Sequence, residues 1–181
     1  MNPQNIQSSP FIQFISTHIV MAWFWFAVRI YVGSVWFEAG FEKVRDQSWT
    51  GVNAGKALSG FIQGSLSKTG GAHPDVQSWY AMFLENVILP HTALWSHVVA
   101  YGELLVGIGL ILGAFTVVAA FFGSFMNLNY LLAGTVSTNP ILLILSIGLI
   151  FAWKISGYIG LDRYIFPLVG TPWQPGRLFK R

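Results

Sequence analysis

Apolar runs of helical length dominate the pattern of hydrophobic and polar positions along this chain. The first runs from Ala22 to Phe41, with the sequence AWFWFAVRIYVGSVWFEAGF, and the second runs from Leu94 to Leu112. A bilayer core is about 30 Å thick, and an α-helix crosses it with about 20 apolar residues. We therefore predict that each of these runs forms a transmembrane helix.

The apolar stretch that follows is too long for a single helix. No residue between positions 104 and 153 is charged, so the chain must fold back within this stretch. Gly113 is predicted to be the C-cap of the second helix, because glycine readily adopts the left-handed conformation that ends many helices. A third span is then expected at 115–133.

A second turn is predicted between Gly134 and Pro140, where small and polar residues interrupt the apolar pattern. Asn139 is expected to be the N-cap of the next helix, with Pro140 as its first residue. The fourth span is predicted at 141–155 and is shorter than the other three.

Residues 42–93, between the first two spans, form a longer segment that is aromatic and amphipathic. Its run from Trp79 to Pro90 is too short to cross a bilayer, so we expect it to lie at the membrane interface or to cap the bundle. The basic residues at and beyond the end of the last apolar run are Lys154, Arg163, Arg177, Lys180 and Arg181. Because basic residues concentrate on the cytoplasmic side, both termini and the tail 156–181 are placed in the cytoplasm and residues 42–93 outside.

The pattern thus predicts an all-α fold, an integral membrane four-helix bundle that forms a single transmembrane domain over residues 1–181 of a multi-pass protein in the cell membrane. The composition agrees, because only 9% of the residues are charged and 54% are hydrophobic. Soluble domains carry about 25% charged residues. The net charge is +3, but five of the ten Lys and Arg residues lie at or beyond the end of the last apolar run. This distribution favours membrane topology over nucleic-acid binding.

The chain contains no cysteine and four histidines. The lack of cysteine excludes thiol chemistry, disulfides and cysteine-ligated iron–sulfur clusters within this chain. No two histidines are expected at one depth on facing helices, so a bis-histidine haem is not predicted. The sequence also has no histidine spacing typical of a metal site, so no metal is expected.

Three ionisable side chains lie inside predicted spans, where each charge costs about 2.5–3.5 kcal/mol on the insertion scale. At about 1.5 Å per residue, Arg29 lies about 10 Å and Glu103 about 13–14 Å from the cytoplasmic ends of their spans. We therefore predict an ion pair between Arg29 and Glu103. Glu38 is predicted to face a polar pocket near the outer surface. An intramembrane pair can serve function or simply lock two helices together, and both interpretations remain open.

Several other side chains are candidates for binding. Asn127 and Asn129 lie in the outer half of the third span, and Trp36 shares a helical face with Arg29. Asparagine can donate a hydrogen bond to a ligand, although hydrogen bonding between helices is its commoner role in membranes.

On the outer side, Lys43 and Arg45 can attract an anionic substrate. A solvated charged loop is the plainer interpretation of each residue taken alone.

Four segments carry a likeness to a known family. They are RIYVGSVWFEAGFEK (residues 29–43), YGELLVG (101–107), MNLNYLLAGTVSTNP (126–140) and GYIGLDR (157–163). In this order, and with the predicted spans, the chain resembles the DoxX/DoxD family of small four-helix membrane proteins over about residues 22–165.

Some members of that family are the membrane subunit of a thiosulfate:quinone oxidoreductase, and others belong to complexes that handle thiol or oxidative stress. The resemblance therefore implies a quinone-linked redox role, with thiosulfate or a related small sulfur compound as the reductant. It transfers no catalytic residue, so the roles rest on the physical argument. The residues expected at the site, as hydrogen-bond donors, ring contacts or proton relays, are Arg29, Trp36, Glu38, Glu103, Asn127 and Asn129.

Two other functions remain open from the sequence. In the first, the chain is a non-catalytic membrane scaffold of a respiratory or stress-response complex, and the Arg29–Glu103 pair is structural. The second, a small-solute transporter, is disfavoured because the sequence shows no inverted repeat. The expected partners are the lipid bilayer, a quinone, and either a partner subunit that carries electrons or a second copy of the chain.

Overall fold

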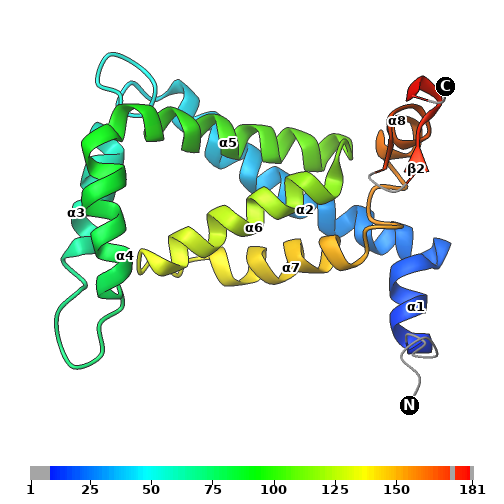
Figure 1. Cartoon of the computed structure of the whole chain (residues 1–181), viewed down its shortest axis with the longest axis horizontal. Coiled ribbons are helices and arrows are strands. Elements are labelled where there is room, and N and C mark those ends of the chain that lie inside the picture. Colours follow the sequence, from blue (N-terminus) through cyan, green and yellow to red (C-terminus); the bar gives the residue numbers. More distant parts are fainter. Residues whose placement is uncertain (1–8, 172–173, 180–181) are drawn as a thin grey trace.

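The computed structural model describes residues 9–171 and 174–179. Within these ranges the regular elements are helices and one short strand pair, joined by turns and loops. The helices that pack side by side are α2 (Ile19–Arg45), α5 (Thr92–Leu112), α6 (Thr116–Leu132) and α7 (Asn139–Phe151). We call these four helices the bundle. Helix α2 packs against α5 and α7, and α6 packs against the same two helices, so that the bundle encloses a common core (Figure 1).

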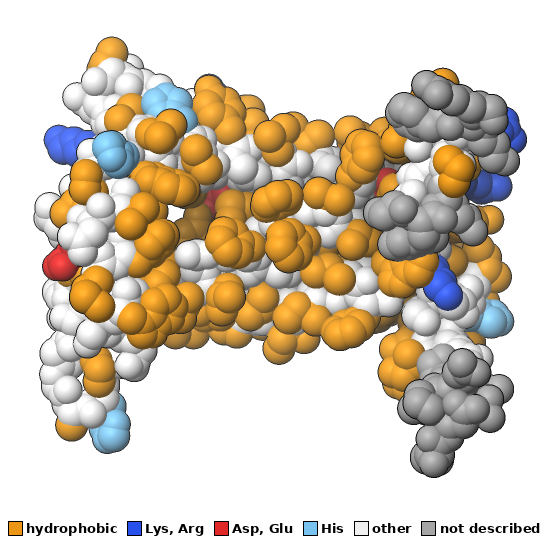
Figure 2. All heavy atoms as spheres, viewed as in Figure 1, with side chains coloured by type: hydrophobic (Ala, Val, Ile, Leu, Met, Phe, Trp, Pro, Cys, Tyr) orange, Lys and Arg blue, Asp and Glu red, His pale blue; other side chains and the backbone are white. Residues whose placement is uncertain are grey.

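The face of the bundle drawn in Figure 2 is largely apolar, and charged and histidine side chains gather toward the two ends of the molecule. Two helical stretches are long and apolar enough to cross a membrane, namely Ile19–Arg45 and Ser78–Leu112. Helices α6 and α7 are apolar but shorter. The apolar runs were therefore located correctly, although α2 extends beyond the predicted 22–41 at both ends and α7 ends at Phe151 rather than at 155.

Residues 46–91, which we call the cap, form a compact layer across one end of the bundle (Figure 1). The elements of the cap are α3 (Lys56–Leu66), α4 (Ser78–Phe83), the π-helix η2 (Leu84–Ile88) and the 3₁₀-helix η3 (Leu89–His91). Leu58, Ile62 and Leu84 contribute to a small apolar core of its own. The helix predicted within 79–90 is thus present, and it caps the bundle.

The opposite end, which we call the hairpin end, holds the turn between α5 and α6 together with α1 (Pro10–Thr17) and α8 (Asp162–Val169) (Figure 1). The indole Nε1 of Trp25 donates a hydrogen bond to the carbonyl of Ile15 at 2.7 Å, which ties α1 to α2. The chain continues through β1 (Gly170–Thr171), which pairs antiparallel with β2 (Gln174–Pro175), and then η4 (Arg177–Phe179).

Glycines set the level at which α2 and α5 cross. Gly33 and Gly40 share one face of α2, and a Cβ added at Gly40 would overlap the backbone of Leu104. A Cβ at Gly107 of α5 would likewise overlap Phe37. The helices therefore pack closely at Gly33 and Gly40, and Phe37 lies level with Gly107 in the bundle.

The two predicted turns are present, with one difference in their capping. Gly113 has φ 65° and ends α5, as predicted. Helix α7 begins at Asn139 itself, with Thr138 as its N-cap, so the prediction that Asn139 is the N-cap was wrong. The Asn139 amide instead donates to the carbonyl of Thr135 at 3.0 Å and braces the turn.

Candidate functional site

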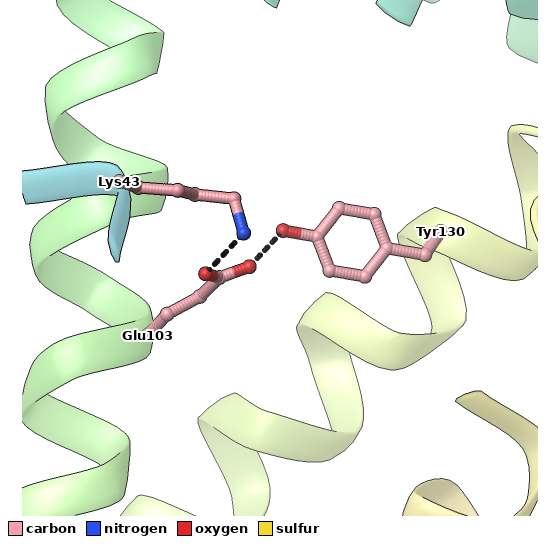
Figure 3. Close-up of polar contacts among 3 residues, drawn as sticks. All are labelled: Lys43, Glu103 and Tyr130. Carbon is pink, nitrogen blue, oxygen red and sulfur yellow. Dashed lines mark hydrogen bonds and ion pairs between the residues drawn. The ribbon is translucent and has the colours of Figure 1, made fainter. Parts of the chain in front are cut away.

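Glu103 on α5 is the centre of a buried polar cluster near the cap end of the bundle. Only 1% of its surface is exposed, and its Oε2 lies 2.7 Å from Nζ of Lys43. The hydroxyl of Tyr130 donates a hydrogen bond to the other carboxylate oxygen, Oε1 (Figure 3). Both oxygens of the carboxylate therefore have a partner, and helices α2, α5 and α6 each contribute one residue to the cluster.

The local sequence explains how these three side chains meet. Gly40 brings the backbone of α2 against Glu103 and Leu104, and Lys43 lies about one turn beyond Gly40 in the last turn of α2. The Lys43 ammonium also lies 5.2 Å from the centre of the Trp49 ring, in the loop that follows α2. Lys43 keeps 22% of its side chain exposed, so it connects the buried carboxylate to the surface under the cap.

The predicted ion pair between Arg29 and Glu103 is wrong. A Cβ at Gly113 would overlap the guanidinium of Arg29, which places this side chain at the hairpin end. Glu103 precedes Gly113 by ten residues, or about 15 Å along α5. The prediction assumed that the start of the first apolar run and the end of the second lie at the same depth. The contacts of Gly33, Gly40 and Gly107 show instead that α2 is shifted along α5 by about three helical turns.

At the hairpin end, Arg29 donates from Nη2 to the carbonyl of Ile159 and is 1% exposed. Asp162 is also buried, and its carboxylate accepts hydrogen bonds from the backbone N–H groups of Phe115 (2.6 Å) and Thr116 (2.9 Å). A carboxylate is favoured at this position because unpaired N–H groups and the helix dipole make the start of α6 positive. These contacts close the hairpin end by fixing residues 159–162 against the α5–α6 turn.

A large apolar groove lies between α5 and α6 and ends beneath the cap. Its volume is about 650 Å³, and its lining along α5 extends from Trp95 to Gly109, about 21 Å of helix. The groove opens between the two helices, since the lining residues Leu105 and Phe122 are more than half exposed. Figure 2 shows the surface hollowed where the cap meets these helices. A groove of this length and lining suits a long apolar molecule.

The few polar groups of the groove gather at its cap end. They come from Tyr130 and Asn129 on α6 and from Tyr80 on α4. The Tyr80 hydroxyl donates to the Asn129 backbone carbonyl (3.0 Å) and its side-chain oxygen (3.1 Å). Burial raises the pKa of Tyr80 to about 12, so this hydroxyl stays protonated near neutrality. Because Tyr130 both lines the groove and binds Glu103, the groove and the buried cluster share this one residue.

Trp36 and Asn127 lie beside this site rather than in the groove. The Trp36 ring stacks on Tyr130 with centroids 6.4 Å apart. Asn127 is fully buried, and among the described residues neither its amide oxygen nor its nitrogen has a hydrogen-bond partner. The Trp36 Nε1 is also without a partner in the described part of the chain. These orphaned groups are suited to bind ordered water inside the bundle.

Glu38 and Arg45 lie away from the cluster. Both are exposed on the outer face of α2, where they share a shallow hollow with Phe41, Glu42 and Asp46. Glu38 thus lies beside other polar side chains, in a hollow on the surface of the bundle. The Arg45 guanidinium lies 5.2 Å from the Phe41 ring centre, and Lys43, the other residue expected to attract an anion, points inward to Glu103 instead.

Sequence reasoning missed three residues that organise the two ends. Tyr130 lies three residues after Asn127 in the same motif, a spacing that puts both on one face of α6, and this signal was available. Asp162 stands beyond the last predicted span, where nothing in the sequence relates it to the start of α6. Tyr80 is one aromatic residue of the amphipathic segment, and no pattern distinguishes it from Trp79.

Comparison with known proteins adds one match. The sequence model described as DoxX matches residues 24–136, which include α2 through α6 apart from the first residues of α2. No curated protein and no solved structure matches the chain.

Proposed function

This chain belongs to the DoxX family, and from that premise we propose that it is the quinone-binding membrane subunit of an oxidoreductase whose reductant is thiosulfate or a related small sulfur compound. The family and the two long apolar helices indicate a membrane protein. In this proposal all four bundle helices cross the bilayer, the cap is outside, and α1 and α8 lie at the cytoplasmic surface. Helices α6 and α7 are about 26 and 20 Å long, a mismatch that local thinning of the bilayer accommodates.

The observation that carries the proposal is the groove between α5 and α6 with its polar end at Tyr130. A quinone has a polar ring and a long apolar tail, and it enters its sites from the lipid. The lateral opening past Leu105 and Phe122 provides that entry, and the apolar lining suits the tail. Tyr130 and Asn129 are placed to hydrogen-bond a ring at the cap end.

A bound quinone takes up two electrons and two protons, and the residues at the polar end suit the proton part of this chemistry. In the structure the Tyr130 hydroxyl donates to the Glu103 carboxylate. In the proposed relay, the Lys43 ammonium passes a proton to Glu103 and regains one from water. The neutral Glu103 carboxyl can then give its proton to Tyr130 while the Tyr130 hydroxyl turns and gives its own to the reduced quinone. Lys43 connects Glu103 to the surface under the cap, since its side chain is partly exposed. The chain has no cysteine, so in this proposal the electrons come directly from the reductant or through a partner subunit.

The proposal is tested by titrating the purified protein in lipid nanodiscs with a short-chain ubiquinone. Binding is measured as quenching of the tryptophan fluorescence. Gly102 lines the groove, and a Cβ there would meet only the Met126 sulfur at 3.6 Å, so Gly102→Leu extends into the groove without disturbing the helix contacts. We expect the Gly102→Leu substitution to weaken quinone affinity about tenfold, because extra methylene groups in a filled apolar site cost about 1–3 kcal/mol.

Gly60→Leu is the matched control, because Gly60 on α3 has open space around it and lies outside the groove. Its affinity should equal that of the unsubstituted protein. Unsaturable binding, or equal losses in both variants, would exclude the groove as the quinone site. If the protein binds quinone at the groove but its membranes do not reduce the quinone with thiosulfate, the quinone site is supported and thiosulfate is excluded as the reductant.

One observation favours the alternative of a non-catalytic scaffold subunit. The Lys43–Glu103–Tyr130 cluster joins three helices with every carboxylate oxygen paired, as a purely structural contact does. Absence of saturable quinone binding, together with co-purification of an intact partner subunit, would support this function instead.

A further inference from the structure

The exposed faces of the bundle helices differ in a way that the proposed function does not explain. The exposed residues of α6 are Val118, Phe121, Phe122, Phe125 and Leu128, and those of α7 are Ile141, Ile144, Ile147 and Phe151. Both sets are entirely apolar, as expected for helix faces that touch lipid tails. The exposed face of α2 is uniformly apolar only toward the hairpin end, at Ile19, Val20, Trp23 and Phe24.

From Ala27 toward the cap end, one face of α2 carries small, polar and charged residues together with the exposed rings of Tyr31 and Phe41. They recur at intervals of three or four positions, which places them on a single stripe, and they are Ala27, Tyr31, Ser34, Glu38, Phe41, Glu42 and Arg45. A repeat of this spacing is typical of a helix that packs along a second helix at a shallow angle. Small residues and serine on such a stripe allow two backbones to approach closely.

Glu38 makes the stripe costly in lipid. By the glycine contacts Glu38 lies level with Val106, about 9 Å from the last residue of α5 and about 21 Å from the first. It is exposed, and it has neither an ion pair nor a hydrogen bond among the described residues. An ionisable side chain at such depth almost always faces a protein neighbour or water rather than lipid.

We infer that this stripe of α2 is the interface between two copies of the chain, related by a two-fold axis along the membrane normal. The charges support a second copy rather than a different partner, because they are self-complementary. Glu42 and Arg45 lie about one turn apart on the same face, so in a parallel pair Glu42 of one copy meets Arg45 of the other, and the reverse pair forms across the axis. The shallow hollow lined by Glu38, Phe41 and Arg45 receives the partner helix.

The rest of the chain is compatible with this pairing. The groove opens between α5 and α6, whereas the stripe lies on α2, so a dimer leaves both grooves accessible from lipid. In such a dimer Ser34 and Glu38 lie near the axis, and the Ser34 hydroxyl of one copy can donate a hydrogen bond to the Glu38 carboxylate of the other. The inference depends on the proposed membrane placement but not on quinone binding.

The absence of native cysteine makes disulfide cross-linking a direct test. A single Ser34→Cys protein, oxidised in membranes without added quinone, should give a product of twice the monomer mass. Phe121→Cys is the control, because it is exposed on α6 at a similar depth and lies outside both the stripe and the groove. Its dimer yield should stay at the background of random collision.

Charge exchange supplies the second arm of the test. In the Ser34→Cys background, Glu42→Arg should lower the yield of dimer about tenfold, because two reciprocal pairs across the axis become repulsive. Adding Arg45→Glu to Glu42→Arg should restore it.

Equal yields from Ser34→Cys and Phe121→Cys, or a cross-linked product whose mass is that of a different protein, would overturn the inference. A double variant that stays monomeric would do the same. Release of the protein from membranes by alkaline washing would instead reject the membrane placement, which separates this failure from that of the dimer.

Discussion

Each end of the bundle buries one charged residue of a long helix, but the groups that contact this residue differ between the two ends. At the hairpin end, Arg29 is enclosed by backbone, with the Ile159 carbonyl as its acceptor and Gly113 and Gly160 packed against it. At the cap end, Glu103 is held by two side chains, of which Lys43 reaches the surface and Tyr130 reaches the groove. A charge sealed by backbone has nowhere to exchange a proton or meet a ligand, whereas a charge linked to a groove and to the surface has both.

From this difference we expect the hairpin end to matter mainly for stability and the cap end mainly for the proposed quinone chemistry. At the hairpin end Asp162 fixes the start of α6, and the Asp162 N–H donates to the Gly113 carbonyl at 2.7 Å. The same turn also holds Arg29, so removal of either charge should loosen the whole end. The cap-end cluster touches fewer backbone groups, so its removal should affect binding more than folding.

The largest expected effect is on stability at the hairpin end. Arg29→Met leaves the Ile159 carbonyl unpaired and the Asp162 carboxylate without its nearby cation, and should lower the free energy of unfolding by about 3–5 kcal/mol. The measurement is unfolding by SDS in mixed micelles. Arg163→Met is the control, since Arg163 is exposed and stacks on Tyr158, and it should change stability by less than about 0.5 kcal/mol. Equal effects of the two substitutions would show that the hairpin end is not held by Arg29.

Glu103→Gln should reverse this pattern at the cap end. Glutamine can still accept the Tyr130 hydrogen bond but cannot relay a proton, so quinone reduction should fall about 100-fold, or about 2.7 kcal/mol in the barrier. The free energy of unfolding should fall by only about 1 kcal/mol, because Lys43 can be solvated. A variant that loses stability as Arg29→Met does, yet keeps full activity, would make the cluster structural and favour the scaffold function.

Tyr130→Phe tests the residue that joins the cluster to the groove. Removing its hydroxyl takes away one hydrogen bond from Glu103 and the proposed donor to the ligand, and should weaken quinone binding about tenfold. Tyr101→Phe is the control on α5, because Tyr101 is exposed and stacks on His97 instead. Quinone titrations in nanodiscs compare the two, and indistinguishable affinities would remove Tyr130 from the site.

The smallest expected effect concerns the attachment of the cap. Tyr80→Phe removes the hydrogen bonds to Asn129 and should lower the free energy of unfolding by about 1 kcal/mol. The folded pKa of Tyr80, about 12, lies above its ordinary value of 10.0. The stability from this linkage is therefore complete below pH 10 and is lost as pH rises through 12. Titration of tyrosinate absorbance should lose a late-titrating component in Tyr80→Phe, and an unchanged titration would contradict the buried hydroxyl.

The sequence predicted much of the fold because the position of each helix follows from the hydrophobic pattern of its own residues. The apolar runs located α2, α5, α6 and α7, and Gly113 marked the turn between α5 and α6. Glu103 was also identified from the sequence, since a carboxylate inside an apolar run stands out whatever surrounds it. The family likeness rested on motifs within these same helices, and the DoxX match agrees with it.

What the sequence could not determine was the partner of each buried charge. Depth counted from the end of an apolar run gives a level only if neighbouring runs start together, and here the contacts of Gly40 and Gly107 shift α2 along α5. That shift made Lys43, rather than Arg29, the cation of Glu103. It moved Arg29 to the hairpin end, where the Ile159 carbonyl accepts its hydrogen bond. Helix position is a local property of the chain, because it follows from hydrophobicity residue by residue. Register is a property of two surfaces packed together, so only the tertiary structure could decide it.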